Sequence, residues 1–240
     1  MLEKFHVAEK DIIRVEEKKL RSVTKQILMT QSLSDKDATI ATDALIKADL
    51  RGVESHGVSN MLRAYLGAFK SNSLNPKPNW KVVKETPSCA TINSDNGLGI
   101  VVAPQAMEIA VEKAKKTGAG IVTMNNCGHL GMLAYHSMIA SQNDMIGTTM
   151  AACSPRMVPT YSSVRALGTN PISYSAPADK LPDFVFDAAM TSVAGNKIVL
   201  ASRLDVPLSK GWIADKNGNP IMEEININEL DNEDESKNLE

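Results

Sequence analysis

The stretch of residues 104–151, PQAMEIAVEKAKKTGAGIVTMNNCGHLGMLAYHSMIASQNDMIGTTMA, indicates the fold class. Its first part carries apolar residues at helical spacing, with Pro104 suited to the first turn of a helix and Gly118 to its end. The elements expected next are a buried strand over residues 120–124, a helix over residues 132–141 and a strand over residues 145–151. This alternation of strand and helix predicts an α/β fold.

Helices are expected to dominate the chain before this stretch. Apolar residues recur at helical spacing around residues 20–28, Ser34 is suited to cap a helix that runs toward Asp49, and a third helix is expected over residues 60–70. The remaining expected elements are short strands over residues 81–83 and 90–92, strands within residues 167–177 and 183–189, a helix within residues 191–204 and a tight turn at residues 215–219.

These patterns divide the chain into three parts. Residues 1–78 are expected to form an N-terminal helical domain, and residues 79–222 an α/β domain that binds a cofactor. Residues 223–240 lose periodicity and fill with acidic side chains, so they are expected to form a disordered tail.

The composition excludes several classes of protein. The 240 residues are 43% hydrophobic and 22% charged, which is ordinary for a globular domain, and no apolar run has the length of a membrane span. The formal net charge is −2, and no basic stripe with interleaved aromatic residues indicates nucleic-acid binding. Cys89, Cys127 and Cys153 fit neither a disulfide framework nor a zinc ribbon, so a reducing cytoplasm is the expected location.

The first candidate site is RGVESHG, residues 51–57. A Ser-His pair between two glycines exposes an imidazole where backbone can approach a ligand, and histidine exchanges protons near neutral pH. The alternative is that His56 caps a helix or is a buried, hydrogen-bonded residue.

The second candidate site is NNCGHLG, residues 125–131. It follows a predicted strand and precedes a predicted helix, which is where α/β proteins gather ligands and where helical N–H groups can meet an anion. A strand-to-helix turn with capping polar residues is the alternative interpretation.

Two later segments carry weaker signals. Residues 167–171, LGTNP, indicate a turn, and residues 185–192, VFDAAMTS, could receive ribose hydroxyls or a phosphate, or could cap a helix. The chain has no G-x-G-x-x-G, no P-loop and no H-E-x-x-H, and its four histidines form no metal-binding pattern, so no metal site is expected.

Four segments taken together resemble the malate/L-lactate dehydrogenase family, which also includes ureidoglycolate, sulfolactate and diketogulonate oxidoreductases. They are, in order, RGVESHGVSNMLRAY (51–65), NNCGHLGM (125–132), LGTNPISYSAP (167–177) and VFDAAMTSVAGNK (185–197). The resemblance implies a nicotinamide-binding fold of the family's own, which is not a Rossmann fold, so the missing glycine fingerprint does not argue against a dehydrogenase.

The same resemblance implies an activity and a set of site residues. The implied reaction is hydride transfer between NAD or NADP and C2 of a small 2-hydroxy or 2-keto acid of the malate or lactate type, in a homodimer. The implied site residues are His56 and His129 for catalysis, Ser55, Asn60 and Arg63 for substrate binding, and Cys153, Asp187, Ala188 and Ala189 for cofactor binding.

The sequence departs from the family pattern in two ways. Many relatives carry an arginine where this chain has Asn60, so we expect either that Arg63, one turn further on, binds the substrate carboxylate or that the substrate is held in a different way. Family members are also longer, and the family pattern stops soon after Pro220. We therefore expect a C-terminally truncated chain, and the alternative function is an inactive relative that retains weak dinucleotide binding or a partner role.

Overall fold

The computed structural model describes residues 3–229 and 237–238 in two compact units. The core unit consists of residues 14–149 and 173–187, and the second unit consists of the other described residues. This division differs from the expected boundary after residue 78, because the N-terminal helices and the first sheet belong to the same unit. In the described part of the chain, no helix is long and apolar enough to cross a membrane.

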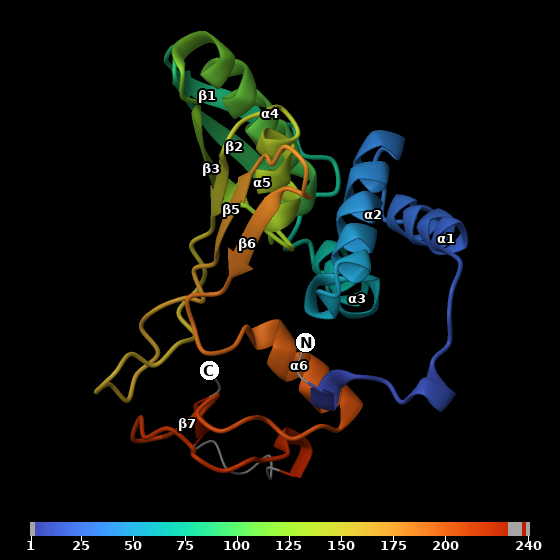
Figure 1. Cartoon of the computed structure of the whole chain (residues 1–240), viewed down its shortest axis with the longest axis vertical. Coiled ribbons are helices and arrows are strands. Elements are labelled where there is room, and N and C mark those ends of the chain that lie inside the picture. The colour runs from blue at the N-terminus through green and yellow to red at the C-terminus, as the bar shows by residue number, and fades with distance from the viewer. Residues whose placement is uncertain (1–2, 230–236, 239–240) are drawn as a thin grey trace. The chain divides into compact units, whose positions relative to one another are not determined.

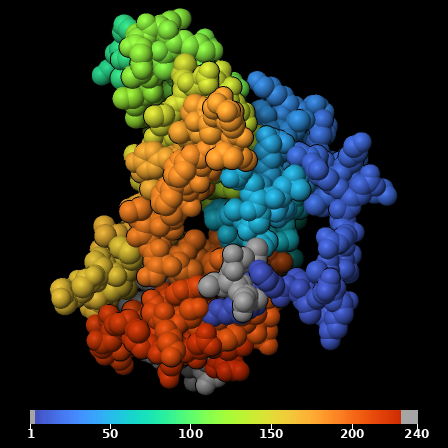
Figure 2. Space-filling view, in the orientation of Figure 1, coloured from blue at the N-terminus to red at the C-terminus, as the bar shows by residue number. Residues whose placement is uncertain are grey.

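Three helices begin the core unit, namely α1 (Glu17–Met29), α2 (Asp35–Leu50) and α3 (Val58–Lys70). They form one continuous surface, blue to cyan in Figure 2, and each contacts the other two. The Ser34 hydroxyl accepts a hydrogen bond from the Asp37 N–H at 3.1 Å and so caps α2, as predicted. The predicted N-terminal helices are therefore confirmed.

The first sheet has the order β1 (Lys81–Glu85), β2 (Cys89–Gly97) and β3 (Ile121–Cys127). Strands β1 and β2 are antiparallel, and β2 and β3 are parallel. Helix α4 (Gly99–Thr117) connects β2 to β3 and packs on one face of the sheet, where Ile92 and Val102 are fully buried (Figure 1). This crossover confirms the predicted α/β class.

Two details of the prediction were wrong. Helix α4 begins at Gly99, so Pro104 lies inside it, because the four residues from Ile100 to Ala103 are buried and their packing extends the helix backward. Strand β3 is not buried on both faces, since within the described residues its side chains alternate between exposed and half-buried and Ile121 is 59% exposed. Gly118 ends α4 in the left-handed conformation, as predicted.

The second sheet has the order β4 (Gly147–Met150), β5 (Ile172–Ala176) and β6 (Phe184–Ala188). Helix α5 (Ala134–Ser141) is joined to it through a buried hydroxyl, because the Ser137 Oγ lies 2.8 Å from the Ser173 Oγ and 2.7 Å from the Ser175 Oγ. These short polar side chains let the helix approach the sheet closely, which places the loop before α5 against β6.

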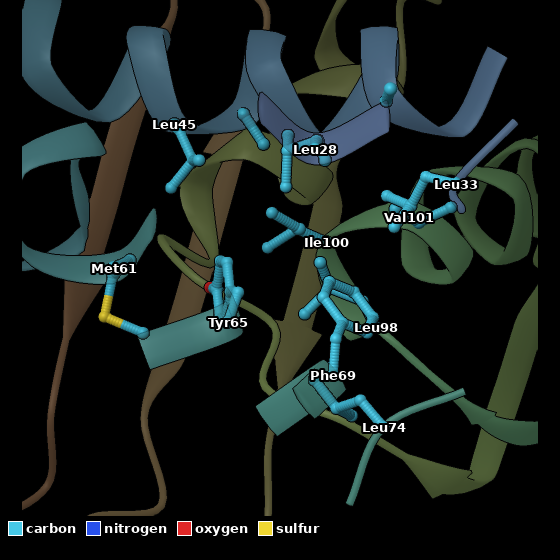
Figure 3. Close-up of a cluster of buried hydrophobic side chains, with 13 residues drawn as sticks. Leu28, Leu33, Leu45, Met61, Tyr65, Phe69, Leu74, Leu98, Ile100 and Val101 are labelled. Atoms are coloured by element: carbon cyan, nitrogen blue, oxygen red, sulfur yellow. The ribbon is translucent and has the colours of Figure 1, made fainter. Parts of the chain in front are cut away.

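A hydrophobic cluster joins the helices to the start of α4. Leu28, Leu45 and Ile100 are almost completely buried in it, and Tyr65 lies among them (Figure 3). The main aliphatic side chains come from α1, α2 and α4, while α3 contributes Met61, Tyr65 and Phe69. The cluster therefore fixes α3 relative to the N-terminus of α4.

The second unit contains the short helices η1 (Glu3–Phe5) and η2 (Glu9–Asp11), then α6 (Gly195–Leu204), β7 (Ala214–Asp215), η4 (Ile227–Glu229) and β8 (Lys237–Asn238). Its own core includes Phe5, Ile198 and Leu208. At the predicted tight turn the Asp215 carboxylate accepts the Asn217 N–H at 2.8 Å, and only Gly218 has a positive φ, of 83°.

The described part of the predicted tail has contacts with the rest of the second unit. The Leu208 N–H donates to the Ile225 carbonyl at 2.8 Å, and Ile225 packs on the core of this unit. The hydrophobic side chains between the acidic residues account for this packing. Residues 230–236 and 239–240, which belong to the same predicted tail, lie outside the described residues.

Candidate active site

The turn between α2 and α3 carries the Ser-His pair. Helix α2 ends near Asp49, η3 (Glu54–His56) follows, and α3 begins at Val58. The Asp49 carboxylate accepts a hydrogen bond from the Val58 N–H at 2.9 Å and so satisfies the first amide of α3. A Cβ on Gly57 would lie 1.6 Å from the Asp49 Oδ1, so a glycine is required for this approach.

His56 is held by its neighbour on this turn. Its Nδ1 lies 2.9 Å from the Ser55 Oγ, and Ser55 itself is buried. The Asn60 side chain is also buried and donates a hydrogen bond to the Ser55 carbonyl at 2.9 Å. Asn60 thus supports the Ser55–His56 turn from within.

The second motif places His129 in the loop after β3, directly against the N-terminus of α4. The His129 carbonyl accepts the Ile100 N–H at 3.2 Å. A Cβ on Gly99 would lie 2.3 Å from the Gly128 carbonyl oxygen and 2.6 Å from that of His129. A side chain at Gly99 is therefore incompatible with the observed position of the loop.

The two motifs meet in space at their histidines. The His56 and His129 rings are stacked, with centroids 5.5 Å apart and an interplanar angle of 15°. His56 is half-buried and His129 is exposed. Two imidazoles at this distance repel each other when both are protonated, so the geometry favours at most one positive charge on the pair.

A third side chain, Tyr65 of α3, completes the cluster and was missed in the sequence. Its hydroxyl lies 2.9 Å from the His129 Nδ1, and the ring is 2% exposed. Burial raises the pKa of Tyr65, so its hydroxyl keeps its proton. The only sequence signal was an aromatic residue with a polar end on the buried face of a helix, and its partner lies 64 residues further on.

The protonation of His129 depends on its surroundings. The protein atoms that surround its ring disfavour the charged form and so lower the pKa of His129, and the solvent exposure of the residue limits this effect. His129 is therefore neutral at pH 7 and can act as a hydrogen-bond donor or acceptor.

His136, in the first turn of α5, has a structural position behind the site. Its Nε2 lies 2.8 Å from the Leu130 carbonyl, to which it must donate, and the residue is 1% exposed. This bond holds the loop that carries His129. Its Nδ1 has no hydrogen-bond partner among the described residues.

The burial of His136 predicts an effect of pH on stability. Burial lowers the pKa of His136 to about 4, so the folded protein keeps it neutral while the unfolded chain takes up a proton below about pH 6.5. Its contribution to the unfolding free energy should therefore fall between pH 6.5 and 4, by up to about 1.4 kcal/mol per pH unit. In a His136→Gln variant, urea unfolding at a series of pH values should show a shallower fall. The exposed His6→Gln is the control, and an unchanged slope in His136→Gln would refute the assignment.

Asp187, at the end of β6, contacts the start of α5. Its Oδ2 accepts the Ala134 N–H at 2.7 Å, and the Leu133 N–H is a further donor. Desolvation raises the pKa of Asp187, and the two amides and the nearby Arg51 partly offset this. The residue is still exposed, so its carboxylate remains accessible to a ligand hydroxyl.

The other predicted cofactor-binding residues lie in the second unit. Ala188 and Ala189 follow Asp187 directly and are half-buried. Cys153 is exposed and its thiol is free, and its backbone N–H donates a hydrogen bond to the Asn170 Oδ1 at 3.0 Å. The structure thus brings together Ser55, His56, Asn60 and His129 in the core unit, but it does not place Cys153, Ala188 or Ala189 relative to them.

Arg63 lies on α3, between Asn60 and Tyr65 in the sequence. It is exposed, and it makes no ion pair with any described residue. Arg63 is therefore available to an anionic ligand.

Among the described residues there is no group of three histidine, cysteine or acidic side chains that could hold a metal ion.

Known proteins are similar to this chain in sequence and in fold. The L-sulfolactate dehydrogenase of Methanocaldococcus jannaschii is 40% identical over 81% of this chain and 56% of its own. The malate dehydrogenase of Pyrococcus horikoshii is 39% identical over 91% of this chain and 60% of its own, and its solved structure matches with a TM-score of 0.81 at 37% identity, over 91% of this chain and 59% of that one. A ureidoglycolate dehydrogenase (NAD(+)) of Escherichia coli is 27% identical over 91% of this chain and 62% of its own.

The match extends over most of the chain. This chain spans about 56–60% of the length of the first two relatives. The family model for malate/L-lactate dehydrogenase matches residues 15–227, which include both histidine motifs and both three-stranded sheets. This chain belongs to the malate/L-lactate dehydrogenase family.

Proposed function

We propose that this chain carries the proton-transfer and substrate-binding residues of an oxidoreductase that interconverts a small 2-hydroxy acid and its 2-keto acid. The observation that supports this most is the stacked pair His56 and His129, held by Ser55 and Tyr65. Malate, sulfolactate and ureidoglycolate, the substrates named for the relatives, are all 2-hydroxy acids. Histidine is suited to exchange the hydroxyl proton of such a substrate near neutral pH.

In the proposed mechanism His56 exchanges a proton with the oxygen on C2 of the substrate. During oxidation His56 accepts the hydroxyl proton, and during reduction it returns a proton to the same oxygen. When bound, a nicotinamide would supply the hydride to C2 or accept it from C2. His129 lies beside His56 and donates a hydrogen bond to the substrate as a neutral imidazole. Stacking against neutral His129 allows His56 to become positively charged without a second cation next to it.

The proposed cofactor is NAD or NADP, held by Asp187, Ala188, Ala189 and Cys153. The exposed carboxylate of Asp187 fits a ribose hydroxyl, which donates a hydrogen bond, better than a phosphate, which it would repel. The similarity to the E. coli ureidoglycolate dehydrogenase (NAD(+)) supports NAD. The small side chains of Ala188 and Ala189 would let a ligand approach the backbone.

The proposal assigns the substrate carboxylate to Arg63. Because a charge-assisted hydrogen bond contributes roughly 1.5–3 kcal/mol, Arg63→Ala should raise the KM for the 2-keto acid about 10- to 100-fold and change kcat less. Steady-state kinetics measure this, with Lys70→Ala, an exposed cation at the end of the same helix, as the control. An unchanged KM in Arg63→Ala would show that another group binds the carboxylate.

We also propose that the protein is a homodimer in the cytoplasm. Exposed hydrophobic side chains such as Ile121 and Ile146, 59% and 77% exposed, support association. The three free cysteines support a reducing compartment. Light scattering should give a mass twice the 25.9 kDa of one chain, and a mass of one chain would exclude the dimer.

A further inference from the structure

The Nδ1 atom of His129 is approached by two groups that donate hydrogen bonds. The Gly131 N–H donates to it at 3.3 Å, and the Tyr65 hydroxyl lies 2.9 Å away. A backbone N–H is only ever a donor, so Nδ1 must carry a lone pair and no proton. The Tyr65 hydroxyl, which keeps its proton because it is buried, then also donates to this lone pair.

In a neutral imidazole one nitrogen carries the proton and the other accepts. If both donors face the His129 Nδ1, the proton is on Nε2. We propose that Tyr65 is a positioning residue that fixes His129 in the Nε2–H tautomer, so that this histidine presents a hydrogen-bond donor to the oxygen on C2 of the substrate. The role assigned to the substrate oxygen rests on the proposed function, whereas the tautomer itself does not.

Tyr65 is well placed for this role because its ring cannot move freely. The ring belongs to the hydrophobic cluster that joins α3 to the start of α4 (Figure 3). The loop that carries His129 accepts the Ile100 N–H at the same end of α4. Because Gly99 has no Cβ, this loop can lie close against the helix. Donor and acceptor are therefore both anchored on α4, and the hydroxyl reaches Nδ1 without further adjustment.

Two other titratable groups near His129 affect its charge. His56 stacks on the ring, and His136 lies close enough to affect its charge. Both disfavour a positive charge on His129 when they are protonated. The hydrogen bonds that reach the His129 Nδ1 come from the Tyr65 hydroxyl and the Gly131 N–H.

The test is nitrogen NMR of histidine-labelled protein, with the His129 signal assigned by a His129→Asn variant. No cofactor or substrate is added, so the result does not depend on activity. In the wild-type protein at pH 7 we expect the Nδ1 signal of His129 to be that of an unprotonated nitrogen and the Nε2 signal that of a protonated one. Protonated Nδ1 in the wild-type protein would overturn the proposal.

The Tyr65→Phe variant removes the hydroxyl and keeps the buried ring. The Nε2–H tautomer should lose part of its population, and the pKa of His129 should rise by up to about one pH unit, because a hydrogen bond to the neutral form is lost. Tyr135→Phe is the matched control, since it removes a hydroxyl that donates to Asp43 at 2.9 Å. Equal His129 signals in wild type and Tyr65→Phe would overturn the proposal.

Turnover by the same variants tests the link to catalysis. Tyr65→Phe should lower kcat roughly two- to tenfold, which is the effect expected from the loss of one hydrogen bond, with a smaller change in KM. Tyr135→Phe should leave kcat unchanged. An NMR change in Tyr65→Phe with unchanged kcat would remove the substrate role of the Nε2–H group but retain the tautomer. A wild-type protein with the expected tautomer and no turnover would contradict the proposed function instead.

Discussion

Replacing His56 by alanine is expected to lower turnover of a 2-keto acid by about 100- to 10,000-fold, the usual contribution of a general acid–base residue. His56 is held by the Ser55 hydroxyl at 2.9 Å and stacks on His129, so its imidazole is already oriented in the folded chain. Because the residue is only half-buried and lies on a turn, its removal should cost little stability. Absorbance of the reduced nicotinamide measures turnover, and circular dichroism checks the fold.

The matched control for His56→Ala is His6→Ala, which removes an exposed histidine of the second unit. Turnover in His6→Ala should equal that of the wild-type protein. A His56→Ala variant that is folded and retains more than about a tenth of wild-type turnover would show that His56 is not the acid–base residue. The assignment would then pass to His129, which lies beside it.

Replacing Gly99 by alanine is expected to destabilise the protein and to displace His129. The new Cβ would lie 2.3 Å and 2.6 Å from the carbonyl oxygens of Gly128 and His129, and both are backbone atoms that cannot rotate away. Overpacking of this kind costs typically about 1–3 kcal/mol. The loop must move to relieve the contact, so turnover should fall together with the unfolding free energy, measured by urea denaturation.

Gly67→Ala is the matched control because it makes the same change in a helix at an open position. A Cβ on Gly67 would have nothing within 4 Å, and Gly67 lies inside α3. This variant should be equally stable or more stable by up to about 1 kcal/mol, with unchanged turnover. If Gly99→Ala were as stable and as active as Gly67→Ala, this result would contradict the close packing of the His129 loop on α4.

The positions of most helices and strands along the chain could be predicted because their signals are local. Ser34 caps α2 and Gly118 ends α4 through contacts with their own neighbours in the chain. The start of α4 could not be predicted from Pro104, because burial of residues 100–103 extends the helix by packing against other elements. The exposed face of β3 was missed for the same reason, since its exposure depends on which face α4 covers.

The candidate site could be predicted in its parts but not in its assembly. His56 and His129 were recognised from two separate motifs, and the sequence contained no sign that their rings stack. Asn60 was predicted to bind substrate, and its amide donates to the Ser55 carbonyl inside the turn. Tyr65 was not recognised, because the hydrogen bond to His129 exists only after α3 and α4 pack together.

The most direct test of the proposed activity is absorbance at the nicotinamide band. The 240-residue protein is mixed with NADH or NADPH and the keto acids that correspond to malate, lactate, sulfolactate and ureidoglycolate. We predict a loss of absorbance with at least one pair, and no loss in the His56→Ala variant. A folded wild-type protein that oxidises neither cofactor with any of these acids would contradict the proposal that this chain is a 2-hydroxy-acid oxidoreductase.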